Sequence, residues 1–108
     1  TQNRKAKGEN KMLQTISEAK KVLTPIFDLY GITRAILFGS VAKGKATSKS
    51  DLDLLVDSKL HGLKFVGFIE AIRNAAGMPV DVLDVSHIDQ GSLIENEIKS
   101  SGVTIYEK

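Results

Sequence analysis

The chain has 108 residues, of which 42% are hydrophobic and 26% are charged, and its formal net charge at pH 7 is +2. This length suits one domain, and the composition is that of an ordinary globular protein. Because cysteine is absent, a disulfide framework and a thiolate zinc site are excluded. No apolar run approaches the ~20 residues that span a bilayer, and the polar, basic N-terminus does not resemble a secretory signal. We therefore expect a cytoplasmic protein that has no membrane segment.

Basic side chains gather in two stretches of the sequence. Residues 1–11 carry four basic side chains and one acidic one, and we predict that they form a flexible segment before a single domain at 12–108. Residues 41–49 contain lysines and no acid: Lys43, Lys45 and Lys49. Neither an aromatic platform nor a base-reading motif accompanies the basic N-terminus, so we do not expect direct nucleic-acid binding.

The first predicted element is a helix over residues 12–30, where apolar residues recur at intervals of three, four and seven. Pro25 lacks an N–H and crowds the preceding turn, so it should kink this helix or begin a new one with Thr24 as the N-cap. Gly31 should end it. A buried strand is expected over 35–38, then a short helical turn and a loop over 41–50, and a second strand over 52–56.

The second half of the chain predicts a helix over 61–76, with Leu63, Val66, Phe68, Ile69 and Ile72 as apolar positions. A strand should follow over 80–85, then a helix over 88–100 capped by Ser86, and a last strand over 103–106. Helices interspersed with short strands favour an α/β (α+β) fold, in which helices pack mainly on one face of a small mixed sheet. In so small a domain, the other face is a candidate docking surface for a protein partner.

Two carboxylates stand at the start of the second predicted strand. Strand side chains alternate, so Asp51 and Asp53 project from one face while Leu52, Leu54 and Val56 point into the core. Two like charges side by side are unfavourable unless a cation neutralises them, and magnesium prefers carboxylate oxygens. An Asp-x-Asp pair alone is nevertheless common in turns.

A third carboxylate, Asp81, begins the strand over 80–85. If that strand lies beside the second one, Asp81 can join the pair, and three carboxylates could hold two metal ions for an in-line phosphoryl displacement. Asp57 and Asp84, at the far ends of the same strands, are expected to be solvated turn residues.

Gly39 and Ser40 end the first strand, eleven residues before Asp51. Glycine permits close backbone approach, and N–H groups at a turn into a helix can receive phosphate oxygens. Lys43 and Lys45 lie within reach to neutralise a triphosphate. A Gly-Ser pair after a strand is often only a turn, but its combination with the carboxylates points to a nucleotide.

Residues 37–56, LFGSVAKGKATSKSDLDLLV, resemble the signature of the nucleotidyltransferase superfamily, and the stretch from about Ile26 to Tyr106 resembles its minimal nucleotidyltransferase (MNT) domains. The resemblance implies that Gly39 and Ser40 contact nucleotide phosphates. It also implies that Asp51, Asp53 and Asp81 are catalytic and hold two Mg²⁺ ions, with Asp81 helping to activate an acceptor hydroxyl. Many relatives carry arginine where this chain has Lys43, which keeps the charge and loses the bidentate geometry.

The same resemblance implies a function. MNT domains frequently act as antitoxins that transfer AMP from ATP to a tyrosine of a HEPN-domain ribonuclease partner, and we expect this role here. One alternative is an antitoxin that acts by binding alone, although all three candidate metal ligands are present. Another is nucleotidyl transfer to a small molecule such as an aminoglycoside, by enzymes that usually carry an added helical domain not evident in this sequence.

Overall fold

The computed structural model describes residues 15–45, 47 and 50–108. The predicted flexible segment 1–11 and the first predicted helical residues lie outside this part of the chain. In chain order, the elements are α2 (Ile16–Tyr30), β1 (Arg34–Phe38), α3 (Gly39–Ala42), β2 (Leu52–Asp57), α4 (Leu63–Ala76), β3 (Val80–Asp84), the 3-10 turn η1 (Val85–His87), α5 (Leu93–Ser101) and β4 (Val103–Glu107). This order confirms the predicted succession of helices and strands.

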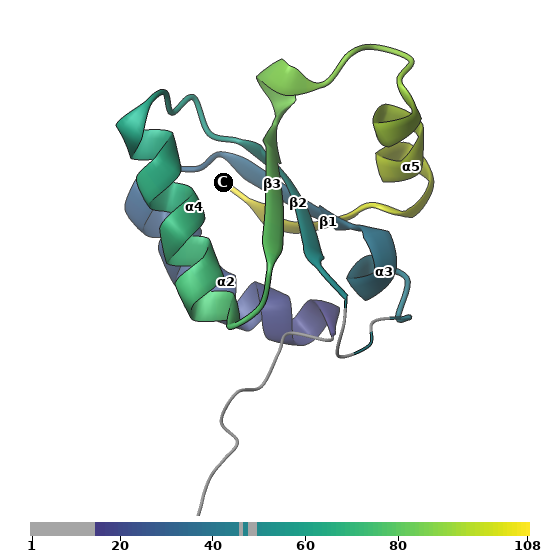
Figure 1. Ribbon diagram of the computed structural model, residues 1–108, viewed down its shortest axis with the longest axis horizontal. Helices are drawn as coiled ribbons and strands as arrows, with labels where there is room; N and C mark the ends of the chain where they lie inside the picture. Colours follow the sequence, from purple (N-terminus) through teal and green to yellow (C-terminus); the bar gives the residue numbers. More distant parts are fainter. Residues whose placement is uncertain (1–14, 46, 48–49) are drawn as a thin grey trace, which may run out of the picture.

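The four strands form one mixed sheet in the order β3-β2-β1-β4. β1 is antiparallel to both β2 and β4, whereas β2 and β3 are parallel. The parallel pair is joined through α4, as parallel strands require a crossover connection. Figure 1 shows α2 and α4 together on one side of the sheet, with α3 and α5 on the other. The predicted mixed sheet is therefore confirmed.

The main core lies between the sheet and the two long helices. Alternate residues of the central strand β2 point into it, and Leu52, Leu54 and Val56 are fully buried there, as the alternation predicts. The helices supply Phe27 and Phe68, whose ring centroids lie 6.2 Å apart. Because the even-numbered residues of β2 point into this core, its odd-numbered residues point to the other face of the sheet.

A smaller apolar cluster covers part of the second face. Phe38 from β1, Leu55 from β2 and Ile98 from α5 are its buried members. Most of the helical packing is on the first face, as predicted, but α5 occupies a stretch of the face that we expected to be free for docking. Not all apolar positions predicted for the helix over 61–76 are buried, since Leu63 and Val66 are exposed.

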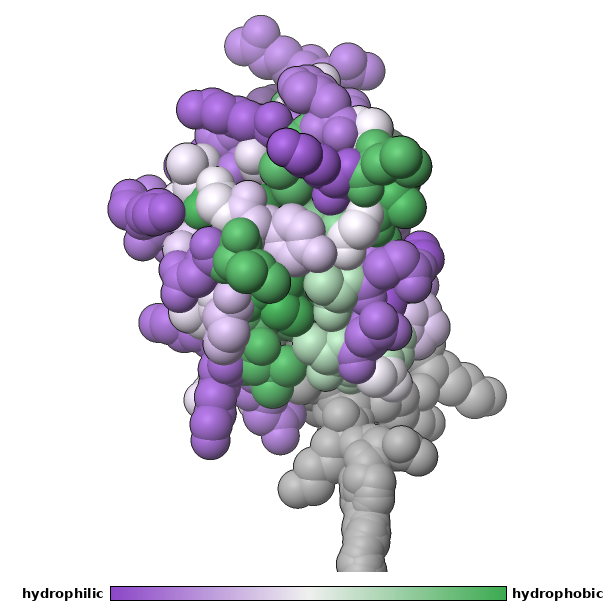
Figure 2. Space-filling view, turned by 90° about the vertical axis from the view of Figure 1, so that its left-hand side faces the viewer, coloured by the Kyte–Doolittle hydropathy of each residue, from purple (hydrophilic) through white to green (hydrophobic). Residues whose placement is uncertain are grey.

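The hydrophobic surface on the side of the long helices is visible in Figure 2. Green side chains gather on the face that Figure 2 shows. Among the large hydrophobic side chains, α2 exposes Leu29, and α4 exposes Leu63 and Val66. Among the described residues, no helix is both long enough and apolar enough to cross a membrane.

The prediction that Thr24 caps a new helix at Pro25 is wrong. α2 runs unbroken through Pro25, and its N-cap is Thr15, which forms a capping box with Glu18. The helix continues because Leu23 and Phe27, on either side of the proline, are both fully buried in the core. Its C-terminus is at Gly31, as predicted, with φ +70°.

The predicted start of the last helix is also wrong. Ser86 lies in η1, and α5 begins only after Ser92, whose hydroxyl accepts the Glu95 N–H at 3.1 Å. The Glu95 carboxylate accepts the Gly91 N–H at 2.6 Å in return. The sequence Ser92-Leu93-Ile94-Glu95 has the spacing of a capping box, so the signal was present in the sequence.

Candidate active site

Two of the three candidate carboxylates are brought together by strand pairing. Asp53 of β2 lies directly beside Asp81 of β3 in the parallel register. Side chains at paired positions point to the same face, and neighbouring strands are about 4.8 Å apart. The third, Asp51, immediately precedes β2 and is exposed. The structure therefore contains the β2–β3 pairing on which the expected approach of Asp81 to Asp53 depends.

The environment of Asp53 disfavours its charged form. The pKa of Asp53 is raised to about 6, mainly by burial and then, in decreasing order, by the nearby charges of Asp81, Asp51 and Glu97. A carboxyl group with this environment gains most from a cation that offsets both its lost hydration and the neighbouring negative charges. The glutamate in this set comes from α5 and was not anticipated from the sequence.

The donor chemistry suits a hard divalent cation, since all the nearby anionic groups are carboxylates. Within the described part of the chain, no three His, Cys, Asp or Glu side chains are already gathered closely enough to hold a metal ion. A cation shared by all three carboxylates would require the exposed Asp51 and Asp81 side chains to turn toward Asp53. Being exposed, they are free of tight packing that would oppose this rotation.

Gly39 joins β1 to α3 directly against the Asp53 carboxylate. Its φ is +75°, a conformation that favours glycine, and the residue is buried. A Cβ atom built at this position would overlap Asp53 Oδ2 and would lie 3.1 Å from Asp53 Cγ. Only glycine permits this approach, so Gly39 sets how close the Gly39-Ser40 turn comes to the Asp53 carboxylate.

Ser40 follows as the second residue of α3 and is half-buried. The first N–H groups of a helix have no partner within the helix, so they are available to an anion. The Ser40 carbonyl oxygen accepts the Lys45 N–H at 2.9 Å, which closes the turn after α3. The close approach of Gly39 places this Gly-Ser turn next to Asp53.

The two candidate lysines occupy different surroundings. Lys43 is the C-cap of α3, and its Nζ lies 3.8 Å from Glu97 Oε2 of α5. Lys45 is exposed, and no ion pair involves it among the described residues. No local pattern in the sequence connects residue 97 with residue 43, because the contact depends on how α5 packs beside α3.

The prediction that Asp84 is a solvated turn residue is wrong. Its side chain is 7% exposed, and its oxygens accept four hydrogen bonds, from the N–H and hydroxyl of Ser58 and of Ser86, at 2.7–3.0 Å. Burial acts to raise the pKa of Asp84, but these hydrogen bonds prevail and lower it to about 2. The residue joins the end of β3 to the segment after β2. Asp57, by contrast, is half-buried at the end of its strand.

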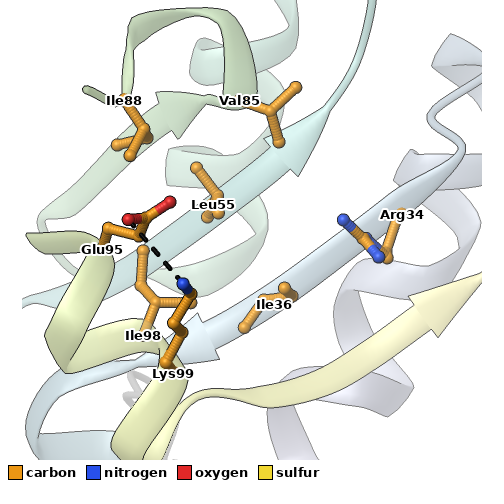
Figure 3. A pocket seen from close by; sticks show the side chains of 8 residues that line it. All are labelled: Arg34, Ile36, Leu55, Val85, Ile88, Glu95, Ile98 and Lys99. Atoms are coloured by element: carbon orange, nitrogen blue, oxygen red, sulfur yellow. Dashed lines mark ion pairs between the residues drawn. The ribbon is translucent and has the colours of Figure 1, made fainter. Parts of the chain in front are cut away.

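A separate pocket lies on the same face of the sheet, beneath α5. Figure 3 shows Glu95, Ile98 and Lys99 of α5 along one side of it and Arg34 at the far end of β1. Its volume is about 300 Å³, and its floor is made by Ile36 and Leu55. α5 thus presents Glu95 and Lys99 to this pocket, whereas Glu97 contacts α3.

Comparison with known proteins agrees with this geometry. The model of the nucleotidyltransferase domain family matches residues 16–105. Protein adenylyltransferase MntA of Thermococcus cleftensis is 30% identical over 83 residues, which cover 71% of this chain and 84% of MntA.

Two solved structures share the fold. A toxin–antitoxin crystal structure with AMP-PNP has a TM-score of 0.70 at 16% identity, covering 82% of this chain and 73% of the other. A structure of tri-AMPylated Shewanella oneidensis HEPN toxin in complex with MNT antitoxin has a TM-score of 0.65 at 13% identity, covering 86% and 73%. At these identities, the likeness concerns the fold.

Proposed function

The chain belongs to the nucleotidyltransferase domain family, and on that premise we propose that it transfers AMP from ATP to a hydroxyl group of a HEPN-domain toxin, for which it is the antitoxin. The observation that carries the proposal is the placement of Asp53 between Asp81 and the Gly39-Ser40 turn. The proposal is supported by the MntA relative, which is named a protein adenylyltransferase, and by the AMPylated toxin in a structure of the same fold.

In the proposed reaction, the acceptor hydroxyl oxygen bonds to the α-phosphorus of ATP. The bond from that phosphorus to the bridging oxygen of the β-phosphate breaks, and pyrophosphate leaves. The proton of the hydroxyl passes to a carboxylate, for which Asp81 is our candidate. It is exposed beside Asp53, where an acceptor from another protein can reach it.

Phosphate binding is assigned to the turn after β1. The Gly39-Ser40 turn lies beside Asp53, and backbone N–H groups at a turn of this kind can bind phosphate oxygens. Lys43 and Lys45 add positive charge beside the turn. As a lysine, Lys43 acts as a point charge on a phosphate rather than as a forked donor.

Asp51, Asp53 and Asp81 are the residues that would hold Mg²⁺, and two ions would fit the charge of three carboxylates facing a triphosphate. Bound there, magnesium would neutralise charge on the phosphates and orient them for displacement. The raised pKa of Asp53 supports this assignment, because a carboxylate crowded by other carboxylates is stabilised by a cation.

A binding-only antitoxin is the second candidate function. It is supported by the large hydrophobic side chains that α2 and α4 leave exposed, Leu29, Leu63 and Val66, since exposed apolar groups suit a protein contact. The two candidates differ in one respect that can be measured. A binding-only antitoxin inhibits its partner without consuming nucleotide.

The test combines the purified chain, the HEPN-domain product of the neighbouring gene, magnesium and ATP labelled on either the α- or the γ-phosphate. We expect label on the partner from the α position only, at a tyrosine hydroxyl. If the complex forms and none of the four nucleoside triphosphates labels the partner, adenylyl transfer is refuted and the binding-only function stands.

A further inference from the structure

Glu97 is held in a defined position beside the candidate site. α5 is capped at its start by Ser92, and its end is pressed against β1 at Gly102. A Cβ at Gly102 would overlap the Ile98 carbonyl oxygen and lie 2.9 Å from Ile36 Cγ2, so the helix and the strand touch there. Because both ends of this short helix are fixed, the position of Glu97 over α3 is fixed as well.

Two interactions connect Glu97 with the site. Its Oε2 lies 3.8 Å from Lys43 Nζ, and its charge contributes to the unfavourable environment of the Asp53 carboxylate. Glu97 is therefore close enough to influence both Lys43, beside the Gly39-Ser40 turn, and Asp53, a candidate metal ligand. Among the described residues, no other acidic side chain forms an ion pair with Lys43.

The charge balance changes when a nucleotide arrives. In the proposed complex, a triphosphate brings several negative charges next to Lys43. One ammonium group cannot pair closely with a phosphate and with the Glu97 carboxylate at the same time. Both side chains are about two-fifths exposed, so the ion pair between them is weak and can be exchanged.

We propose that Glu97 is a positioning residue. It forms an ion pair with Lys43 in the nucleotide-free protein and competes with the triphosphate for the Lys43 ammonium group. Lys43 moves from Glu97 to the phosphates when the nucleotide binds, and the carboxylate sets the affinity for nucleotide without taking part in the chemical step. This proposal rests on the proposed role of Lys43 in phosphate binding, and it adds a residue from α5 to the site.

A matched control is present on the same helix. Glu95 forms an ion pair with Lys99 that has the same N–O distance, 3.8 Å, and these two residues line the pocket beneath α5 in Figure 3 instead of contacting α3. Glu95→Gln removes one charge from α5 and leaves an amide oxygen that can still accept the Gly91 N–H. It reproduces the general effect of Glu97→Gln on charge while leaving Lys43 untouched.

The experiment measures binding of the α,β-methylene analogue of ATP with magnesium by calorimetry, using the whole chain without acceptor. We expect Glu97→Gln to tighten binding about two- to fivefold, the range that an exposed ion pair allows. Glu97→Asp, which retains the charge, and Glu95→Gln should bind as the wild type does. In a Lys43→Gln background, Glu97→Gln should have no effect. In transfer assays, the single variant Glu97→Gln should lower KM for ATP and leave kcat unchanged.

Each contrary outcome has a distinct meaning. If Glu97→Gln binds the analogue as the wild type does or more weakly, the proposed competition for Lys43 is wrong. It is also wrong if Glu97→Gln raises the affinity equally in the Lys43→Gln background, because the gain would then be a general effect of charge. If Lys43→Gln itself binds the analogue as the wild type does, the phosphate-binding role of Lys43 is wrong. If the wild type binds no analogue, the proposed function fails first.

Discussion

Gly39 offers the sharpest test of how the fold prepares the site. Gly39→Ala places a methyl group where the structure has the Asp53 carboxylate, since the new Cβ would overlap Asp53 Oδ2. The end of a flexible side chain can yield more easily than backbone, so we expect Asp53 to move and the fold to persist. A displacement of about 1 Å at a reacting centre can lower a rate about 100-fold.

The backbone contribution of this substitution can be measured separately. Gly31 has φ +70°, close to the +75° of Gly39, and a Cβ built there meets no atom within 4 Å. A non-glycine residue in this conformation costs about 1–2 kcal/mol. Gly31→Ala therefore reports the backbone cost alone, far from the site at the end of α2.

We expect both variants to lose about 1–2 kcal/mol of unfolding free energy in urea titrations, and only Gly39→Ala to lose about 100-fold in kcat/KM for nucleotidyl transfer. The reasoning is refuted if Gly39→Ala transfers nucleotide as fast as Gly31→Ala does. It is also refuted if Gly31→Ala loses activity to the same extent, because the loss would then follow from stability.

Two further predictions concern stability. The pKa of Asp84 is about 2 in the folded chain against 3.8 ordinarily, so its ionised form stabilises the fold by about 2 kcal/mol above pH 4, and this contribution disappears as the pH falls from about 4 to about 2. Acid titrations of the unfolding free energy should show that slope in the wild type and lack it in Asp84→Asn; equal slopes would contradict the assignment. Thr15→Ala removes the cap of α2 and should cost about 1 kcal/mol in thermal unfolding, whereas Thr47→Ala, in a loop, should cost less. Equal losses would show that the capping box is not what stabilises the start of α2.

The sequence predicted those parts of the site that depend on local pattern. The alternation of β2 placed Leu52, Leu54 and Val56 in the core, which leaves Asp53 on the opposite face. The glycine after β1 was predicted to permit a close approach, and the structure identifies the approaching group as the Asp53 carboxylate. Periodicity sufficed here because strand side chains alternate regardless of what packs around them.

What escaped prediction depends on contacts between distant segments. Asp84 was expected in solvent, and only the packing of the segment after β2 supplies Ser58 as its partner. Glu97 reaches Lys43 across 54 positions of the chain because α5 packs beside α3. Pro25 was expected to kink α2 or to begin a new helix, and no new helix begins there, because burial of the residues on either side outweighs one missing hydrogen bond. Side-chain patterns describe neighbours along the chain, and these three cases are decided by neighbours in space.

The most direct test of the central claim is transfer of α-labelled AMP to the HEPN partner by Asp53→Asn beside Asp57→Asn. Both substitutions neutralise an aspartate of β2, and the two aspartates lie four positions apart on the same strand. We expect Asp53→Asn to fold and to bind the partner but to transfer no label, and Asp57→Asn to label the partner as the wild type does. Labelling by Asp53→Asn at the wild-type rate would contradict the assignment of this carboxylate to the reaction.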